Sequence, residues 1–164
     1  MPTDLSLDID ERPTRSWIYR SDEHRLPEVV IRGMKSKYKR LDAQWQVMDV
    51  RQMSFQNQAF DIAIDKGTTD SMFHGSMWDP PDDVRDNIQR YLSEVARILV
   101  PGGIFLDITY RQPQFIRPLL IREEIWRLDV QKLPDQGAGG VFEYFAYMMK
   151  KHGATGEAKG KETG

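Results

Sequence analysis

Apolar residues alternate with polar ones in some stretches of this chain and recur every three or four positions in others. Alternation is typical of strands and the longer period of helices. Phe60–Asp65 and Ile104–Tyr110 are predicted strands, and Pro101-Gly102-Gly103 is predicted to turn the chain into the second of them. The segment between them has a helical apolar stripe, made of Val84, Ile88, Tyr91 or Leu92, Val95, and Ile98 or Leu99. Strand, crossover helix and strand form a right-handed parallel unit.

The segments before this unit predict one helix and one strand. Residues 27–40 place apolar residues four apart behind an opening proline, which favours a helix. Residues 43–50 alternate like a strand that ends near Asp49. The apolar cluster at 16–19 is consistent with either a short strand or a docking patch, and the sequence does not choose between them.

The segments after this unit predict a short helix and two strands. Residues 114–121 look helical, with a kink or a break at Pro118. Residues 125–130 and 141–149 are the predicted strands. Because no helix separates these two strands, they should pair antiparallel.

Composition narrows the class of protein. A chain of 164 residues suits one domain with one core. The 23 basic and 25 acidic residues nearly cancel and no basic stripe stands out, so no nucleic-acid partner is expected. There is no cysteine, which excludes disulfides and thiolate metal sites. No apolar run has the length of a membrane span and the N-terminus is acidic, so we expect a cytoplasmic protein without a membrane partner.

Polar residues at the predicted strand ends are the candidates for a ligand site, because open α/β sheets bind ligands there. Asp49 ends one strand, where it either accepts hydrogen bonds from a ligand or caps a turn. Asp65-Lys66-Gly67 ends the next strand, and Gly67 allows close approach of the backbone or a positive φ. Asp70 and His74 follow, but their spacing is a poor ligand set, and no metal site is predicted.

Four features occur here in a familiar order: Met48-Asp49-Val50, then Phe60 to Asp70, then Leu99 to Gly103, then the closing strand pair. The chain resembles the seven-strand (class I) methyltransferases that use S-adenosylmethionine. The Asp-Lys-Gly-Thr-x-Asp run is most similar to the branch with the eukaryotic elongation factor 1A lysine methyltransferases. The resemblance covers roughly residues 27–151.

The resemblance implies S-adenosylmethionine as cofactor and a protein substrate, with a lysine of a translation elongation factor as its acceptor. It places Asp49 and Val50 at the adenine end of the cofactor. It places Asp65, Lys66 and Gly67 near the methionine portion, where substrate enters. Asp70, and Tyr110 at the next strand end, are candidates for the acceptor pocket. These assignments require that the strand tips at 49, 65 and 110 lie together at one cleft.

The chain also departs from this family pattern. Family members have an early strand with a glycine-rich loop around the cofactor, whereas no glycine precedes Pro27. The expected fold is therefore an incomplete Rossmann-like sheet, mostly parallel with an antiparallel C-terminal strand. Residues 1–26 would be a flexible or unrelated leader, 27–151 a partial methyltransferase domain, and 152–164 a disordered tail.

Two other functions compete with a methyltransferase. The missing glycine loop fits a non-catalytic truncated protein or partner subunit. A nicotinamide-dependent reductase is a weaker alternative, because the chain lacks the G-x-G-x-x-G run after a first strand and because such a reductase does not account for the closing antiparallel pair.

Overall fold

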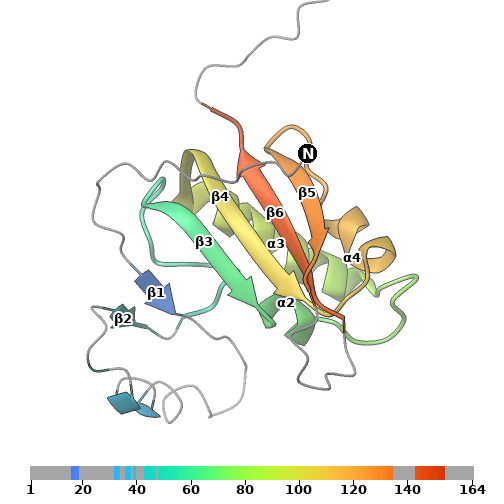
Figure 1. Ribbon diagram of the computed structural model, residues 1–164, viewed down its shortest axis with the longest axis horizontal. Coiled ribbons are helices and arrows are strands. Elements are labelled where there is room, and N and C mark those ends of the chain that lie inside the picture. Colours follow the sequence, from blue (N-terminus) through green and yellow to red (C-terminus); the bar gives the residue numbers. More distant parts are fainter. Residues whose placement is uncertain are drawn as a thin grey trace, which may run out of the picture.

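A mixed sheet of four strands forms the centre of the described structure (Figure 1). The computed structural model describes residues 16–18, 32–33, 36–37, 39, 43–46, 48–134 and 143–153. The strands lie in the order β3-β4-β6-β5. Their bounds are Phe60–Lys66 for β3, Leu99–Thr109 for β4, Trp126–Lys132 for β5 and Phe145–Lys151 for β6.

The strand directions agree with the sequence pattern. β3 and β4 are parallel, and β6 runs antiparallel to both of its neighbours, β4 and β5. β5 therefore has the same direction as β3 and β4. The predicted mostly parallel sheet with an antiparallel C-terminal strand is confirmed, as is the antiparallel pairing of the last two strands.

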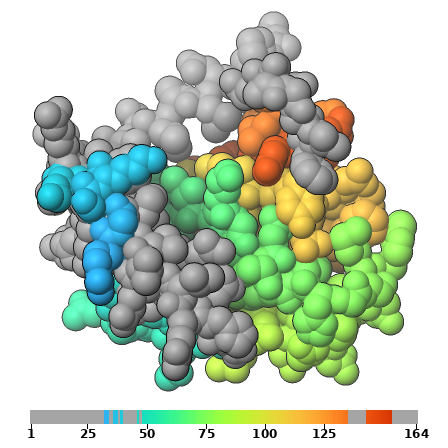
Figure 2. Space-filling model, turned by 90° about the horizontal axis from the view of Figure 1, so that it is seen from below, coloured from blue at the N-terminus to red at the C-terminus, as the bar shows by residue number. Residues whose placement is uncertain are grey.

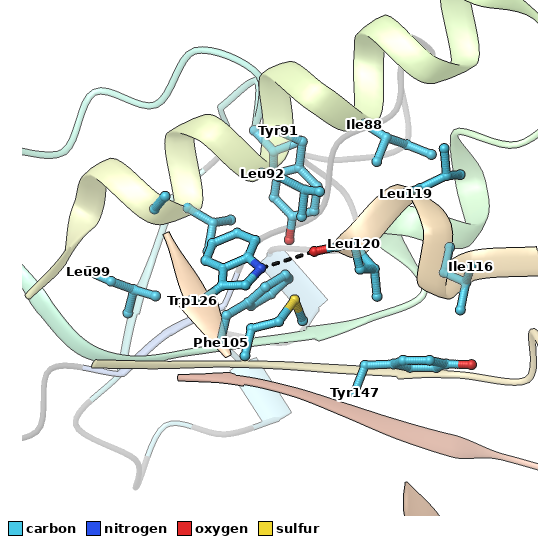
Figure 3. Close-up of a cluster of buried hydrophobic side chains, with 14 of the residues drawn as sticks. Ile88, Tyr91, Leu92, Leu99, Phe105, Ile116, Leu119, Leu120, Trp126 and Tyr147 are labelled. Atoms are coloured by element: carbon cyan, nitrogen blue, oxygen red, sulfur yellow. Dashed lines mark hydrogen bonds between the residues drawn. The ribbon is translucent and has the colours of Figure 1, made fainter. Parts of the chain in front are cut away.

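Helices α3 (Asp82–Ile98) and α4 (Pro113–Leu120) cover the same face of the sheet, behind it in Figure 1. The predicted stripe of α3 is buried, because its apolar residues recur at helical spacing on the side that faces β4. Figure 3 shows this core, in which the indole of Trp126 lies between α3 and Phe105 and donates to the carbonyl of Leu120 at 3.0 Å. The helices and the sheet thus bury one common core on this face.

The strand predicted at 43–50 is shorter in the structure. β2 covers only Ala43–Trp45 and pairs in parallel with β1 (Ser16–Ile18), in a sheet separate from the main one. The alternative of a strand at 16–19 is thus confirmed for residues 16–18. Asp49 lies beyond β2, so the prediction that three neighbouring strand tips meet at 49, 65 and 110 is wrong for 49. Alternation alone does not show which strand a segment will pair with.

Parts of three predictions fall outside the described residues. In the predicted helix at 27–40, Arg32, Gly33, Ser36 and Lys37 are helical and most other positions are not described. Most of the predicted leader and residues 154–164 of the predicted tail also lie outside the described part of the chain. In that part, no helix is long and apolar enough to cross a bilayer.

The break that the sequence allowed at Pro118 is absent, and α4 is one helix from Pro113 to Leu120. Its buried residues Ile116, Leu119 and Leu120 hold it against the core despite the missing backbone donor. The alternative of a kink stays a prediction. The segment that follows Gly67 begins with a short helix, α2 (Thr68–Ser71).

Pro101-Gly102-Gly103 is not a turn between helix and strand, as predicted, but part of β4. The strand begins at Leu99, directly after α3, and its register against β3 shifts between Phe60 and Ile62. Gly102 has φ +81, and a Cβ on Gly103 would lie 2.9 Å from the carbonyl oxygen of Val100 and 3.0 Å from that of Asp61. The glycines therefore allow β4 to pass close to β3 at this irregularity.

Gly103→Ala is expected to lower the free energy of unfolding by about 2 kcal/mol, because the added methyl group would press on two backbone carbonyls. Gly102→Ala is the matched control. It meets no atom within 4 Å and should cost about 1 kcal/mol, from its left-handed backbone alone. Urea denaturation of both variants measures the difference. Equal losses would contradict the close approach of β4 to β3 at Gly103.

Candidate functional site at the carboxyl ends of β3 and β4

The two parallel strands end side by side, and their last residues form the candidate site. Asp65 pairs in register with Asp107, and Asp107 with Tyr147 of β6. Asp107 is two residues after Phe105, whose ring packs edge-on to Tyr91 of α3. Because strand side chains alternate, this row of polar residues points to the helix-covered face. Lys66, one residue further along β3, points to the opposite face.

Asp65 fixes the chain segment that leaves β3. Its carboxylate accepts from the backbone amide of Thr68 at 2.9 Å, and from the amide and the hydroxyl of Thr69 at 3.0 and 2.8 Å. These bonds satisfy backbone amides at the start of α2. The residue before this helix is Gly67, with φ 93, which has no side chain that could cap the helix. Asp65 is only 3% exposed. Its visible role is to position the Lys66-Gly67-Thr68 segment.

Asp70 and Arg111 join α2 to the segment after β4. Arg111 Nε donates to Asp70 Oδ1 at 2.9 Å, and Thr109 Oγ1 donates to the same oxygen at 2.6 Å. The guanidinium also lies 4.0 Å from the centre of the Phe73 ring. The side chains of Arg111 and Asp70 are 8% and 14% exposed. In Figure 2, residues near 70–80 (green) form the surface beside those near 110–115 (yellow to orange).

Asp107 lies beneath this pair and was not predicted. It is 0% exposed, and neither carboxylate oxygen has a hydrogen-bond partner in the described structure. The nearby Thr69 hydroxyl already donates to Asp65. Burial, followed by the charges of Asp65 and Asp70, raises the pKa of Asp107 well above its ordinary value of 3.8. Burial of the carboxyl group therefore favours its neutral form over the carboxylate.

Tyr147 completes the polar row under the site. Its hydroxyl donates to the carbonyl oxygen of Arg111 at 2.8 Å. Burial, and then the charges of Asp107 and Asp70, raise the pKa of Tyr147, so the phenol stays protonated. The segment that begins with Tyr110 is thereby tied to both α2 and β6.

Lys66 does not form an ion pair with the adjacent Asp65. Its Nζ instead lies 5.8 Å from the centre of the Tyr144 ring, just before β6. Tyr144 and Tyr110 are 39% and 43% exposed. The sequence had pointed to Lys66 and Tyr110. It had no signal for Tyr144, which is distant in sequence and reaches the site only through β6.

Asp49 and Val50 lie in a turn after β2. The Asp49 carboxylate accepts from the Arg51 amide at 2.8 Å and from the Arg51 guanidinium at 2.8 to 3.2 Å. The hydrogen bonds from the Arg51 side chain lower the pKa of Asp49 despite its partial burial. Val50 is buried. The carboxylate therefore caps a turn, and its contact with a ligand stays a prediction.

His74 is held away from Asp70. Its ring lies 2.7 Å from a carboxylate oxygen of the exposed Asp83. Within the described ranges, no three histidines or acids are placed to hold a metal ion.

Comparison with known proteins identifies the family. A family model described as a methyltransferase domain matches residues 26–107, which are 82 of the 164 residues. The chain belongs to this methyltransferase family. The match includes β3, α3 and most of β4, and therefore Asp65, Lys66 and Gly67.

Curated relatives of this methyltransferase-domain chain carry a more specific name. EEF1A lysine methyltransferase 4 of Mus musculus is 37% identical over 90 residues, which are 53% of this chain and 35% of the relative. The protein of that name from Bos taurus is 33% identical over 127 residues, which are 75% of this chain and 48% of the relative. The chain thus spans about half, or less, of the length of these relatives.

Solved structures support the Rossmann-like methyltransferase fold. The N-methyltransferase NodS of Bradyrhizobium japonicum, in complex with S-adenosyl-L-homocysteine, has a TM-score of 0.54 at 16% identity. The match covers 84% of this chain and 66% of NodS. The cyclase SpnF has a TM-score of 0.55 at 13% identity, over 85% and 67% of the two chains. Likeness at such low identity shows the fold alone, and chemistry must be argued from the site.

Proposed function

We propose that this protein binds S-adenosylmethionine at the carboxyl ends of β3 and β4 and takes part in methylation of a protein lysine. The observation that carries the proposal is the Lys66-Gly67 segment, held in place by Asp65 beside Tyr110 at the sheet edge where α/β proteins bind ligands. The names of the curated relatives support elongation factor 1A as the class of acceptor.

The backbone at Gly67 leaves room for a ligand to approach. A Cβ built on Gly67 meets no atom within 4 Å, so the backbone is open to a ligand there. When bound, S-adenosylmethionine would supply an electrophilic methyl group on its sulfonium. The chain's part is to position donor and acceptor, which is the main requirement of such a displacement. We assign Lys66 and Gly67 to the methionine side, with Asp65 positioning them, and Asp49 and Val50 to the adenine side.

We further propose that residues 27–151 form the methyltransferase domain of this chain and that the protein acts in the cytoplasm, where a translation factor would be available. Asp70 and Tyr110 remain the proposed acceptor side of the site. The Asp70 carboxylate already accepts hydrogen bonds from Arg111 and Thr109. Asp70 would therefore act indirectly, by holding Arg111 in place.

Titration of S-adenosylhomocysteine into the purified protein is expected to give saturable heat in a calorimeter. Gly67→Ala should weaken this binding by about tenfold, because its methyl group would enter the space over the segment. Gly102→Ala is the matched control, since Gly102 also has a left-handed φ, of +81, and also meets no atom within 4 Å, but lies near the opposite end of β4. Similar stability of the two variants in urea would show that the binding loss is local.

Absence of any saturable heat with the wild-type protein would refute cofactor binding by this chain. The alternative of a non-catalytic protein or partner subunit would then be favoured. If cofactor binds, purified elongation factor 1A with labelled S-adenosylmethionine is the acceptor test. Mass spectrometry of the product should find added methyl groups on lysine, and methylation of other side chains alone would contradict the proposed acceptor.

A further inference from the structure

Lys66 turns away from the acids next to it and lies over an aromatic ring. Asp65 and Lys66 are consecutive on β3, so their side chains leave opposite faces of the sheet. Lys66 Nζ is 5.8 Å from the centre of the Tyr144 ring and makes no ion pair with any residue that the structure describes. An ammonium ion at this distance from a ring is attracted to its face. The Tyr144 ring is therefore a position that accepts an ammonium group.

Tyr110 lies beside Tyr144 at the same edge. Thr109 of β4 and Phe145 of β6 are the last residues of these two strands that pair with each other. Tyr110 comes directly after Thr109 in the chain, and Tyr144 comes directly before Phe145. Lys66 is in register with Ile108, two residues before Tyr110. Both tyrosines lie just outside the strands, and the Tyr110 ring centre also lies 5.5 Å from the Arg111 guanidinium. Both are more than a third exposed, so a ligand at the sheet edge can reach their rings.

We infer that the acceptor lysine side chain enters over the Tyr144 ring, with Tyr110 beside it, and that Lys66 makes this position select the uncharged amine. The inference rests on the proposed function and adds the group that recognises the acceptor. Two ammonium groups cannot share one ring, because like charges within roughly 4–6 Å disfavour the charged form. An incoming lysine would lose its proton to solvent, and the electron pair of the broken N–H bond would stay on nitrogen.

Two small probes test the selection by charge without cofactor or turnover. n-Butylamine mimics the lysine side chain and is protonated at pH 7, since its pKa is close to that of lysine, about 10.4. 1-Butanol is a neutral probe of similar length. Shifts of the Tyr144 ring signals in NMR spectra report binding of either. In the wild-type protein, butanol is expected to bind more tightly than butylammonium.

Lys66→Met should raise the affinity for butylammonium by about fivefold and leave that for butanol within about twofold. Tyr144→Leu should lower the affinity for both probes, and Tyr144→Phe, which keeps the ring, should restore most of it. Lys150→Met is the charge-matched control, because Lys150 pairs in register with Ile104, at the other end of β6. Unchanged butylammonium affinity in Lys66→Met, or undiminished affinity in Tyr144→Leu, would overturn the inference.

Titration of S-adenosylhomocysteine into Tyr144→Leu separates the inference from the proposed function. Wild-type affinity for this ligand supports an acceptor role for Tyr144, whereas loss of binding makes Tyr144 a cofactor contact and overturns the inference. If S-adenosylhomocysteine does not bind to the wild-type protein, both the proposed function and the acceptor role are overturned. In a protein that methylates lysine, Lys66→Met should move the midpoint of the pH–rate profile up by about one pH unit, and Lys66→Arg should restore it.

Discussion

Arg111→Met is expected to lower the free energy of unfolding by about 3 kcal/mol, because it breaks a largely buried ion pair and leaves Asp70 without its cation. Methionine keeps most of the length of the side chain, so the loss of volume is small. The guanidinium contact with the Phe73 ring is lost as well. Urea denaturation followed by circular dichroism measures the change. Arg111 is thus predicted to join α2 to the segment after β4 by its charge.

Arg127→Met is the matched control for this prediction. Arg127 also pairs with an aspartate, Asp129, at 3.1 Å, but on an exposed part of β5. Solvent screens such a pair, and its loss should cost less than about 1 kcal/mol. The double variant Asp70→Asn/Arg111→Met should lose less than the sum of the single changes, because both remove one interaction. Equal effects at 111 and 127 would contradict a structural role for the buried pair.

Asp107→Asn is expected to stabilise the protein at pH 8 and to leave its stability near pH 4 almost unchanged. Burial raises the pKa of Asp107 in the folded protein above its ordinary value of 3.8, so the folded state retains a proton that the unfolded state has lost. Stability then falls as pH rises from about 4 to the folded-state pKa, by up to about 1.4 kcal/mol per pH unit. Asparagine is nearly the same shape and cannot ionise.

Urea denaturation of wild type and variant at pH 4, 6 and 8 measures this difference. The difference between the two proteins is the quantity of interest, because other acids such as Glu94, whose pKa Arg97 lowers, change stability in the opposite sense. Asp129→Asn, at an exposed position on β5, controls for the loss of a carboxylate. A constant difference across the three pH values would show that Asp107 is ionised in the folded protein.

The sequence by itself was sufficient to predict the parallel unit that carries the site. Apolar periodicity located β3, α3 and β4, because each element must bury one face and its spacing follows from backbone geometry. The direct connection between β5 and β6 predicted their antiparallel pairing. The Asp65-Lys66-Gly67 run at a strand end identified the segment that the structure holds at the carboxyl edge.

Only the tertiary structure decided which partners these residues meet. The neighbours of Asp107, Tyr144 and Arg111 are brought together by sheet register and by the packing of α2, and local sequence does not encode contacts between distant segments. The expectation for Asp49 was wrong for the same reason. The pairing of β2 with β1 ends at Trp45, although the alternating pattern continues beyond it. Sequence determined the main strands and helices of the parallel unit, and packing determined which charges are buried, paired or exposed.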